Sequence, residues 1–138
     1  MLTYGIKLCH RCGVRSTGPN GPRSPLKKFK LSAEQIRPIA TGRGGAYASD
    51  DIVVAGKPVG YMYREQPDNS YDSGWRFLSG EETDAYMEDA SKFGFYDVNT
   101  VANYDPEIIA ILDSPIGSAY IRGPNGLAPD PAGPPTPQ

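Results

Sequence analysis

Residues 72–82 read DSGWRFLSGEE and contain the only tryptophan of the chain. The first three residues have the composition of a turn. In the four that follow, Trp75 and Phe77 occupy alternate positions and therefore share one face of an extended segment. The pattern predicts a turn and then a short strand whose two aromatic side chains enter the core.

A helix is expected to follow this strand. Ser79 and Glu82 have the spacing of a capping box, in which the two side chains satisfy backbone N–H groups at the start of a helix. The acidic residues that follow favour the same position, because the helix dipole stabilises negative charge in the first turn. We expect this helix to run to about Asp89.

Two strands are expected upstream of this stretch. Residues 46–49 and 52–54 are rich in β-branched and aromatic side chains, which are typical of strands. Residues 55–58 have turn composition, and residues 59–64 alternate as a strand does. The order strand, turn, strand predicts a β-hairpin.

Downstream, a strand, a helix and a last strand are expected. Residues 93–98 are aromatic and extended in pattern, and residues 99–104 connect them to a helix that begins at Asp105 and Pro106. The apolar residues of this helix recur at i, i+3 and i+4, so it buries one face. Residues 118–122 have the composition of a final strand.

Together these segments predict an α+β fold. We expect a single small domain over residues 28–122, with a mainly antiparallel twisted sheet and two or three short helices. The chain has 16 glycines and 14 prolines, which cluster at its ends, so both termini are expected to be flexible. Residues 1–27 are interpreted as an irregular basic leader, and residues 123–138 as a disordered proline-rich tail.

Charge is distributed unevenly around a net value of −2. Residues 1–43 carry nine Lys or Arg and one Glu, whereas residues 44–138 carry five basic and fifteen acidic residues. A basic leader is either a solvated segment or a contact for nucleic acid. The acidic remainder repels nucleic acid and attracts basic proteins, so nucleic acid is the less expected partner.

The sequence also bears on the compartment. It contains no run of about 18 apolar residues, so no membrane-spanning helix is expected. Its N-terminus, MLTYGIKLCHRCG, has polar residues where a secretory signal needs an apolar core. We therefore expect no contact with a membrane and a cytoplasmic location.

The two cysteines, Cys9 and Cys12, are spaced as half of a zinc knuckle. Structural zinc takes four ligands, and His10 between the cysteines is the only other soft ligand in the leader. Free thiols are the favoured interpretation because the ligand count is too low. A metal shared between two chains and a redox pair remain open alternatives.

Carboxylates dominate the candidate chemistry of the chain. His10 is the sole histidine and lies in the leader, so no Ser-His or Cys-His pair is expected. The acidic residues match no calcium-binding loop, and the glycines around Arg43 match no phosphate-binding motif. We therefore expect neither an enzyme nor a bound cofactor. The alternative is a small-ligand-binding protein or a carboxylate-based hydrolase with its site near Asp72–Glu82.

Five segments of the chain resemble a known bacterial family. They read VGYMYRE (59–65), DSGWRFLSGEE (72–82), YDVNT (96–100), NYDPEI (103–108) and DSPIGS (113–118). In this order and spacing they are similar to immunity protein family thirty-three, and the resemblance runs from about Lys28 to Arg122.

The resemblance implies a small cytoplasmic α+β protein of a polymorphic toxin system. Members of the family are assigned to bind and neutralise a cognate toxin, so the implied partner is a protein. Residues 1–27 and 123–138 fall outside the family pattern. The resemblance names neither the toxin nor the oligomeric state.

The predicted partner-binding residues are charged side chains of the acid-rich middle of the chain. They are Arg64, Glu65, Asp68, Asp72, Arg76, Glu81, Asp97 and Asp105. Core packing and helix capping already account for the aromatic and capping residues of the stretch 72–82. Asp72, Arg76 and Glu81 are therefore left free to face a partner.

Overall fold

The computed structural model describes residues 27–135. The strands within this range are β1 (Gly45–Ser49), β2 (Tyr61–Arg64), β3 (Asp72–Leu78), β4 (Phe93–Asp97), β5 (Ala119–Gly123) and β6 (Gly126–Pro129). The α-helices are α3 (Asp50–Val53), α4 (Asp84–Met87) and α5 (Val98–Tyr104). Short 3₁₀ helices are η2 (Ala33–Gln35), η3 (Ala90–Lys92) and η4 (Pro106–Ile111).

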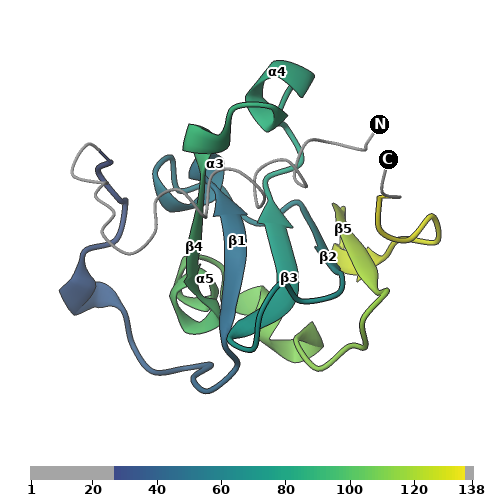
Figure 1. Cartoon of the computed structure of the whole chain (residues 1–138), viewed down its shortest axis with the longest axis horizontal. Helices are drawn as coiled ribbons and strands as arrows, with labels where there is room; N and C mark the ends of the chain where they lie inside the picture. The colour runs from purple at the N-terminus through teal and green to yellow at the C-terminus, as the bar shows by residue number, and fades with distance from the viewer. Residues whose placement is uncertain (1–26, 136–138) are drawn as a thin grey trace.

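The strands form one open sheet in the order β4-β1-β3-β2-β5-β6. β1 and β3 pair in parallel, and every other neighbouring pair is antiparallel. β3, which contains the sequence WRFL, lies in the interior of the sheet (Figure 1). The predicted α+β single-domain fold with a mainly antiparallel sheet is confirmed.

One face of the sheet packs against α3, α5 and η4 to form the main core. Trp75 and Phe77 of β3 lie there, with stacked rings whose centroids are 6.1 Å apart. Met62 of β2, Val101 of α5 and Ile108 of η4 complete the layer, and Figure 1 shows α5 behind β4 and β1. The prediction that both aromatic side chains of β3 enter the core is confirmed.

The opposite face carries a smaller apolar cluster and a buried arginine. Tyr63 and Leu78 pack there with Met87 of α4. Arg76 alternates with the two core aromatics of β3 and so points to this same face. Tyr47 and Tyr63 stand opposite Arg76 on the two neighbouring strands.

The hairpin predicted from residues 46–54 and 59–64 is wrong. β1 pairs with β3 and β4, not with β2. After β1 the chain turns into α3, whose first two residues are acidic and whose Ile52 and Val53 are buried. Acidic residues favour a helix start, and burial against the sheet overrides the strand preference of β-branched residues.

The helix predicted from Ser79 begins later. α4 starts at Asp84, and the side chain of Thr83 caps its first turn. Glu82 does accept the N–H of Ser79 at 2.8 Å, as in a capping box. It also accepts the hydroxyl of Ser49 at 2.6 Å. Glu82 therefore ties the turn after β3 to the end of β1 instead of starting a helix.

Two segments expected to lack regular structure form defined elements. Residues 99–104, predicted as a connection, belong to α5, whose N-cap Asp97 accepts the N–H of Asn99 at 2.8 Å. Residues 126–129, part of the predicted disordered tail, form β6 along β5. That prediction is wrong for this segment, because pairing satisfies the outer edge of β5 and Leu127 packs against the core.

Other predicted elements are confirmed. β3, β4 and β5 occupy the strands expected near residues 75–78, 93–98 and 118–122. The helix predicted at Asp105 and Pro106 is present as the 3₁₀ helix η4, with Asp105 at its N-cap. These segments combine strong local signals with burial, so their local and tertiary preferences agree.

Candidate functional site

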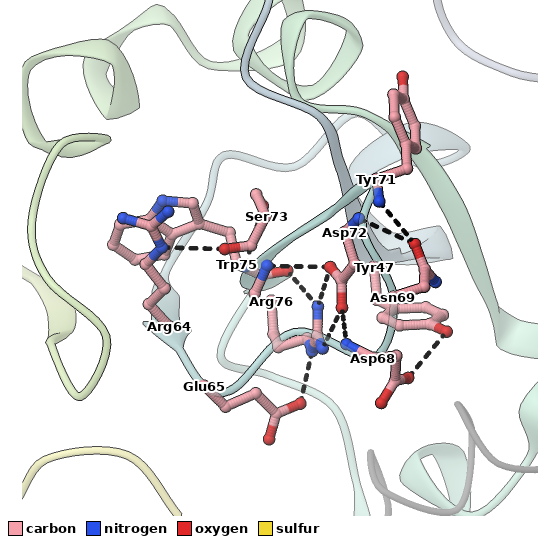
Figure 2. Close-up of polar contacts among 11 residues, drawn as sticks. Tyr47, Arg64, Glu65, Asp68, Asn69, Tyr71, Asp72, Ser73, Trp75 and Arg76 are labelled. Atoms are coloured by element: carbon pink, nitrogen blue, oxygen red, sulfur yellow. Dashed lines mark hydrogen bonds and ion pairs between the residues drawn. The ribbon is translucent and has the colours of Figure 1, made fainter.

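Arg76 of β3 is the centre of a buried charge network. The Arg76 side chain is 0% exposed, and its Nη1 and Nη2 donate to the two carboxylate oxygens of Asp72 at 2.9 Å each. Its Nε donates to Glu65 at 2.5 Å. Figure 2 shows the guanidinium group between these two acids. Such pairing is required because an unpaired buried charge is costly.

The carboxylate of Asp72 is saturated with hydrogen bonds. Besides Arg76, it accepts the N–H of Gly74 at 2.9 Å and the N–H of Asp68 at 2.8 Å. Burial acts to raise the pKa of Asp72, but the hydrogen bonds and charge of Arg76 outweigh it and hold this pKa below its ordinary value. Burial likewise acts to lower the pKa of Arg76, and its two acidic partners raise it instead.

Tyr47 of β1 covers the Arg76 guanidinium. The Arg76 Cζ lies 4.7 Å from the centroid of the Tyr47 ring, which is cation–π geometry. The Tyr47 hydroxyl donates to Asp68 at 3.5 Å. Burial and the charge of Asp68 raise the pKa of Tyr47 well above its ordinary value. The network therefore joins β1, β3 and residues 65–71 (Figure 2).

A β-bulge shapes the start of β3. The register with β1 shifts by two residues between Asp72 and Arg76. Gly74 within the bulge has φ +93°, and a Cβ at this position would overlap the carbonyl oxygen of Glu65. The sequence Asp-Ser-Gly is therefore a structural requirement: the glycine permits the bulge, and the aspartate pairs with Arg76.

Arg64, at the end of β2, connects β3 to the loop after η4. Its Nε donates to the carbonyl of Ser73 at 2.9 Å, and its Nη1 to the carbonyl of Ser114 at 2.7 Å. The Arg64 Cζ lies 5.7 Å from the centroid of the Trp75 ring. Within residues 27–135, no carboxylate forms an ion pair with Arg64. Two backbone carbonyls and the face of the Trp75 ring therefore stabilise its charge.

An open depression of about 480 Å³ lies beside the network. Residues 42–44, ahead of β1, and residues 70–73, at the start of β3, form much of its lining. Arg64, Pro67 and Asp97 complete it. Because these segments meet at the bulge, the buried network fixes the shape of the depression.

Tyr71 is an exposed aromatic residue at the depression. It is 52% exposed, its hydroxyl donates to Asp97 at 2.7 Å, and its ring meets that of Phe95 edge to face. The hydrogen bond to Asp97, followed by burial, raises the pKa of Tyr71. A ring held in one position loses little freedom when a partner covers it. Tyrosine is also enriched among residues that dominate binding energy.

Arg43 lines the same depression. Its Nη1 donates to Asp113 at 2.6 Å, but the Asp113 side chain is 87% exposed. An ion pair in solvent contributes little to stability and exchanges its partner easily. The Arg43 guanidinium is therefore available for a second acid.

The structure brings six of the eight predicted partner-binding residues together around this depression. These six are Arg64, Glu65, Asp68, Asp72, Arg76 and Asp97. The expectation that Asp72 and Arg76 face outward is wrong, because both are buried and pair with each other. Asp68 is exposed, and the remaining three are half-buried.

The other two predicted residues lie apart from the depression. Asp105 is buried and accepts the N–H of Val59 at 2.9 Å and Nη2 of Arg122 at 2.6 Å. It therefore connects the start of η4 to the segment just before β2 and to β5. Glu81 is exposed in the turn after β3 and pairs with Lys57 at 2.7 Å.

Sequence reasoning does not single out Tyr71 and Arg43 as residues of the depression, or Asp113 as the partner of Arg43. Tyr71 is one of nine tyrosines, and no local pattern separates it from those of the core. Arg43 lies between glycines, which predict only a flexible entry into β1. Asp113 begins the motif DSPIGS, which is the signal that could have identified it.

The carboxylates at the two ends of residues 72–82 do not converge. β3 separates Asp72 from Glu82, and its seven residues span about 20 Å at the usual rise of a strand. These two acids cannot act on one bond. Within residues 27–135, no group of three or more His, Cys, Asp or Glu side chains is placed to hold a metal ion.

Two further predictions concern the leader and the membrane. Cys9 and Cys12, considered above as a half zinc site, lie outside the described residues. In the part of the chain that the structure describes, no helix has the length and apolar character needed to cross a bilayer.

Fold and site define a small α+β domain with a buried charge network and an arginine- and tyrosine-lined surface depression. The Immunity protein Imm33 domain matches residues 46–128, more than half of the chain, and the protein belongs to this family. The family resemblance stated from the sequence is confirmed. No curated protein and no solved structure gives a significant match.

Proposed function

We propose that this protein binds and neutralises a cognate bacterial toxin of a polymorphic toxin system. The observation that carries the proposal is its membership of the Imm33 immunity family over residues 46–128. It acts in the cytoplasm by protein–protein contact, catalyses no reaction and requires no cofactor. Its partner is a protein, not a nucleic acid or a membrane.

The rigidity of the depression supports a binding role. The Arg76–Asp72 pair and the bulge at Gly74 fix the loop of residues 65–71 to the sheet. A surface that is already ordered loses less entropy when a partner binds. Asp72 and Asp97 belong to the lining of the depression, and their carboxylates are engaged in hydrogen bonds, which suits a structural use better than acid–base chemistry.

We infer that the toxin contacts the surface around the depression. Asp68 and Tyr71 are exposed there, and Glu65 and Asp97 are half-buried. The acidic side chains speed the encounter with a basic protein, while the fixed aromatic ring supplies contact area. Arg76 influences binding through the fold alone.

Co-expression tests the function. The protein should restore growth to cells that produce the toxin encoded beside it, and the purified pair should elute as one complex. Restored growth without a complex would point to an indirect effect. Absence of protection and of binding with every toxin encoded nearby would reject the proposal.

A charge reversal tests the surface. Asp68→Lys should weaken toxin binding about tenfold or more, because it places a positive charge in a surface that meets a basic partner. Glu34→Lys is the matched control, since Glu34 is an exposed acid on η2, outside the depression. Equal affinities for the two variants would remove Asp68 from the contact surface. Circular dichroism would confirm that both variants are folded.

A further inference from the structure

The hydrogen-bonding groups of the depression are unequally used. Its two arginines retain unused N–H donors. Arg43 donates through Nη1 alone, and Arg64 donates through Nε and Nη1. Within the described residues, Nη2 of both side chains and Nε of Arg43 make no hydrogen bond. A guanidinium group has five N–H donors and no acceptor. The depression therefore offers unused positive donors.

Its acidic groups, by contrast, are occupied. The two oxygens of Asp72 accept four hydrogen bonds, from Arg76 and from two backbone N–H groups. One oxygen of Asp97 accepts the N–H of Asn99 and the other accepts the Tyr71 hydroxyl. An incoming group would meet free donors and engaged acceptors, which favours an anion that accepts hydrogen bonds.

The surroundings of the depression fit a protein ligand. Tyr71 is exposed at its lining, and Ile116, 46% exposed, belongs to the loop that supplies Asp113 and the carbonyl of Ser114. Arginine and tyrosine are the residue types that dominate binding energy in protein interfaces. A planar carboxylate matches the fork of a guanidinium group, which can bind both of its oxygens.

We propose that the depression accepts a carboxylate side chain, an Asp or Glu of the toxin, which binds Arg43 and Arg64 and packs against Tyr71. The incoming carboxylate takes the place of Asp113 on Arg43, because Asp113 is held in solvent. This inference rests on the proposed toxin-binding function for the identity of the ligand. The chemistry of the depression can be tested without the toxin.

The first test uses a small probe. N-acetyl-aspartate methylamide is titrated into the ¹⁵N-labelled full-length protein while the arginine Nε–H and backbone N–H signals are followed by NMR. Saturable shifts at Arg43, Arg64 and Tyr71 are expected with this probe and not with N-acetyl-asparagine methylamide, its neutral counterpart. Equal responses to the two probes, or no saturable response, would overturn the proposal whether or not a toxin binds.

The second test uses the toxin complex. Arg43→Gln should weaken toxin binding about tenfold or more, because it removes a charged donor from the interface. Arg37→Gln is the matched control, since Arg37 is exposed outside the depression and should leave the affinity unchanged. Unchanged affinity for Arg43→Gln would overturn the toxin carboxylate as the ligand.

The outcomes separate this inference from the proposed function. A toxin that binds the protein but ignores Arg43→Gln contradicts the inference and leaves the immunity function intact. A probe that binds while no toxin does contradicts the immunity function and with it the toxin as the source of the carboxylate.

Because Arg64 also supports the loop after η4, Arg64→Lys, which keeps the charge, is the preferred variant at this position instead of a neutral one.

Discussion

Acidic residues lie at both ends of β3, but their environments differ. At its start, Asp72 and Glu65 surround Arg76, which is completely buried. At its end, Glu81 is 68% exposed and pairs with a lysine that also lies in solvent. Proximity of acidic residues in the sequence therefore does not establish a shared role. Asp72 and Glu65 share a role because both pair with the buried Arg76.

The energetic consequence follows from the surroundings of each charge. A buried charge has lost its water, so removing its partner leaves it uncompensated. An exposed charge regains water when its partner is lost, at little cost. Changes at the start of β3 should therefore affect folding, whereas a change at Glu81, after its end, should affect the surface alone.

Arg76→Leu should have the largest effect. It leaves Asp72 and Glu65 without their cation and should lower the free energy of unfolding by about 3–5 kcal/mol. Urea unfolding measures the loss. Arg37→Leu is the matched control, because Arg37 is exposed, and it should change stability by about 0.5 kcal/mol or less.

A second variant sharpens this result. Adding Asp72→Asn to Arg76→Leu should recover part of the lost stability, because one of the uncompensated charges is then removed. If Arg76→Leu alone lowers the free energy of unfolding by less than about 1 kcal/mol, the buried Arg76–Asp72 pair does not make the start of β3 more important for folding than its end.

Gly74→Ala should have the next largest effect. A methyl group at this position is strained by the positive φ and also overlaps the carbonyl of Glu65, so a loss of about 3 kcal/mol is expected. Gly117→Ala separates the two causes, because Gly117 has φ +99° with open space around it. That control should lose about 1 kcal/mol, and equal losses would show that the close approach to Glu65 is unimportant.

Glu82→Gln tests the acidic residue after the end of β3 whose carboxylate is engaged in hydrogen bonds. Glu82 accepts hydrogen bonds from the N–H groups of Ser79 and Gly80 at 2.8 and 3.0 Å and from the hydroxyl of Ser49 at 2.6 Å. The amide cannot accept all three, so a loss of about 1–2 kcal/mol in unfolding free energy is expected. An unchanged free energy would indicate that water replaces these bonds and that this end of β3 does not need them.

Acid should act on the start of β3 through Asp72. The folded protein holds the pKa of Asp72 below its ordinary value. Its contribution is therefore complete above the ordinary range of aspartate and is lost as pH falls below about 4, by at most about 1.4 kcal/mol per pH unit. Stability measured from pH 6 to pH 2 should fall less steeply for Asp72→Asn than for the natural protein. Identical slopes would contradict the assignment.

Much of the fold follows from local signals in the sequence. The aromatic alternation around Trp75 predicts β3 and the face that it turns to the main core, and Asp105 with Pro106 predicts the start of η4. The parallel pairing of β1 and β3 cannot be predicted in this way, since it depends on contacts between distant residues. The strand predicted at Ile52 and Val53 is wrong for the same reason: these residues are buried as part of the helix α3, and that burial depends on tertiary contacts.

The candidate site follows less well from the sequence. Arg76 and Asp72 are charged, and charged residues usually lie at the surface. Their burial depends on the bulge at Gly74 and on Tyr47 from another strand, neither of which the local pattern reveals. Tyr71 is the reverse case: the local sequence does not distinguish it from the tyrosines of the core, yet its side chain is exposed.

Glu81→Gln should have the smallest effect on folding. Its hydrogen bond to Lys57 raises the pKa of that lysine, but both side chains lie in solvent, so the denaturant midpoint should stay within experimental error. A shifted midpoint would show that the exposed end of β3 also supports the fold. Because substitutions at Glu81 should leave folding unaltered, a change in toxin affinity would report directly whether Glu81 contacts the toxin. A weakened complex with Glu81→Lys would extend the contact surface to this end of β3, and an unchanged one would confine it to the depression at the start of the strand.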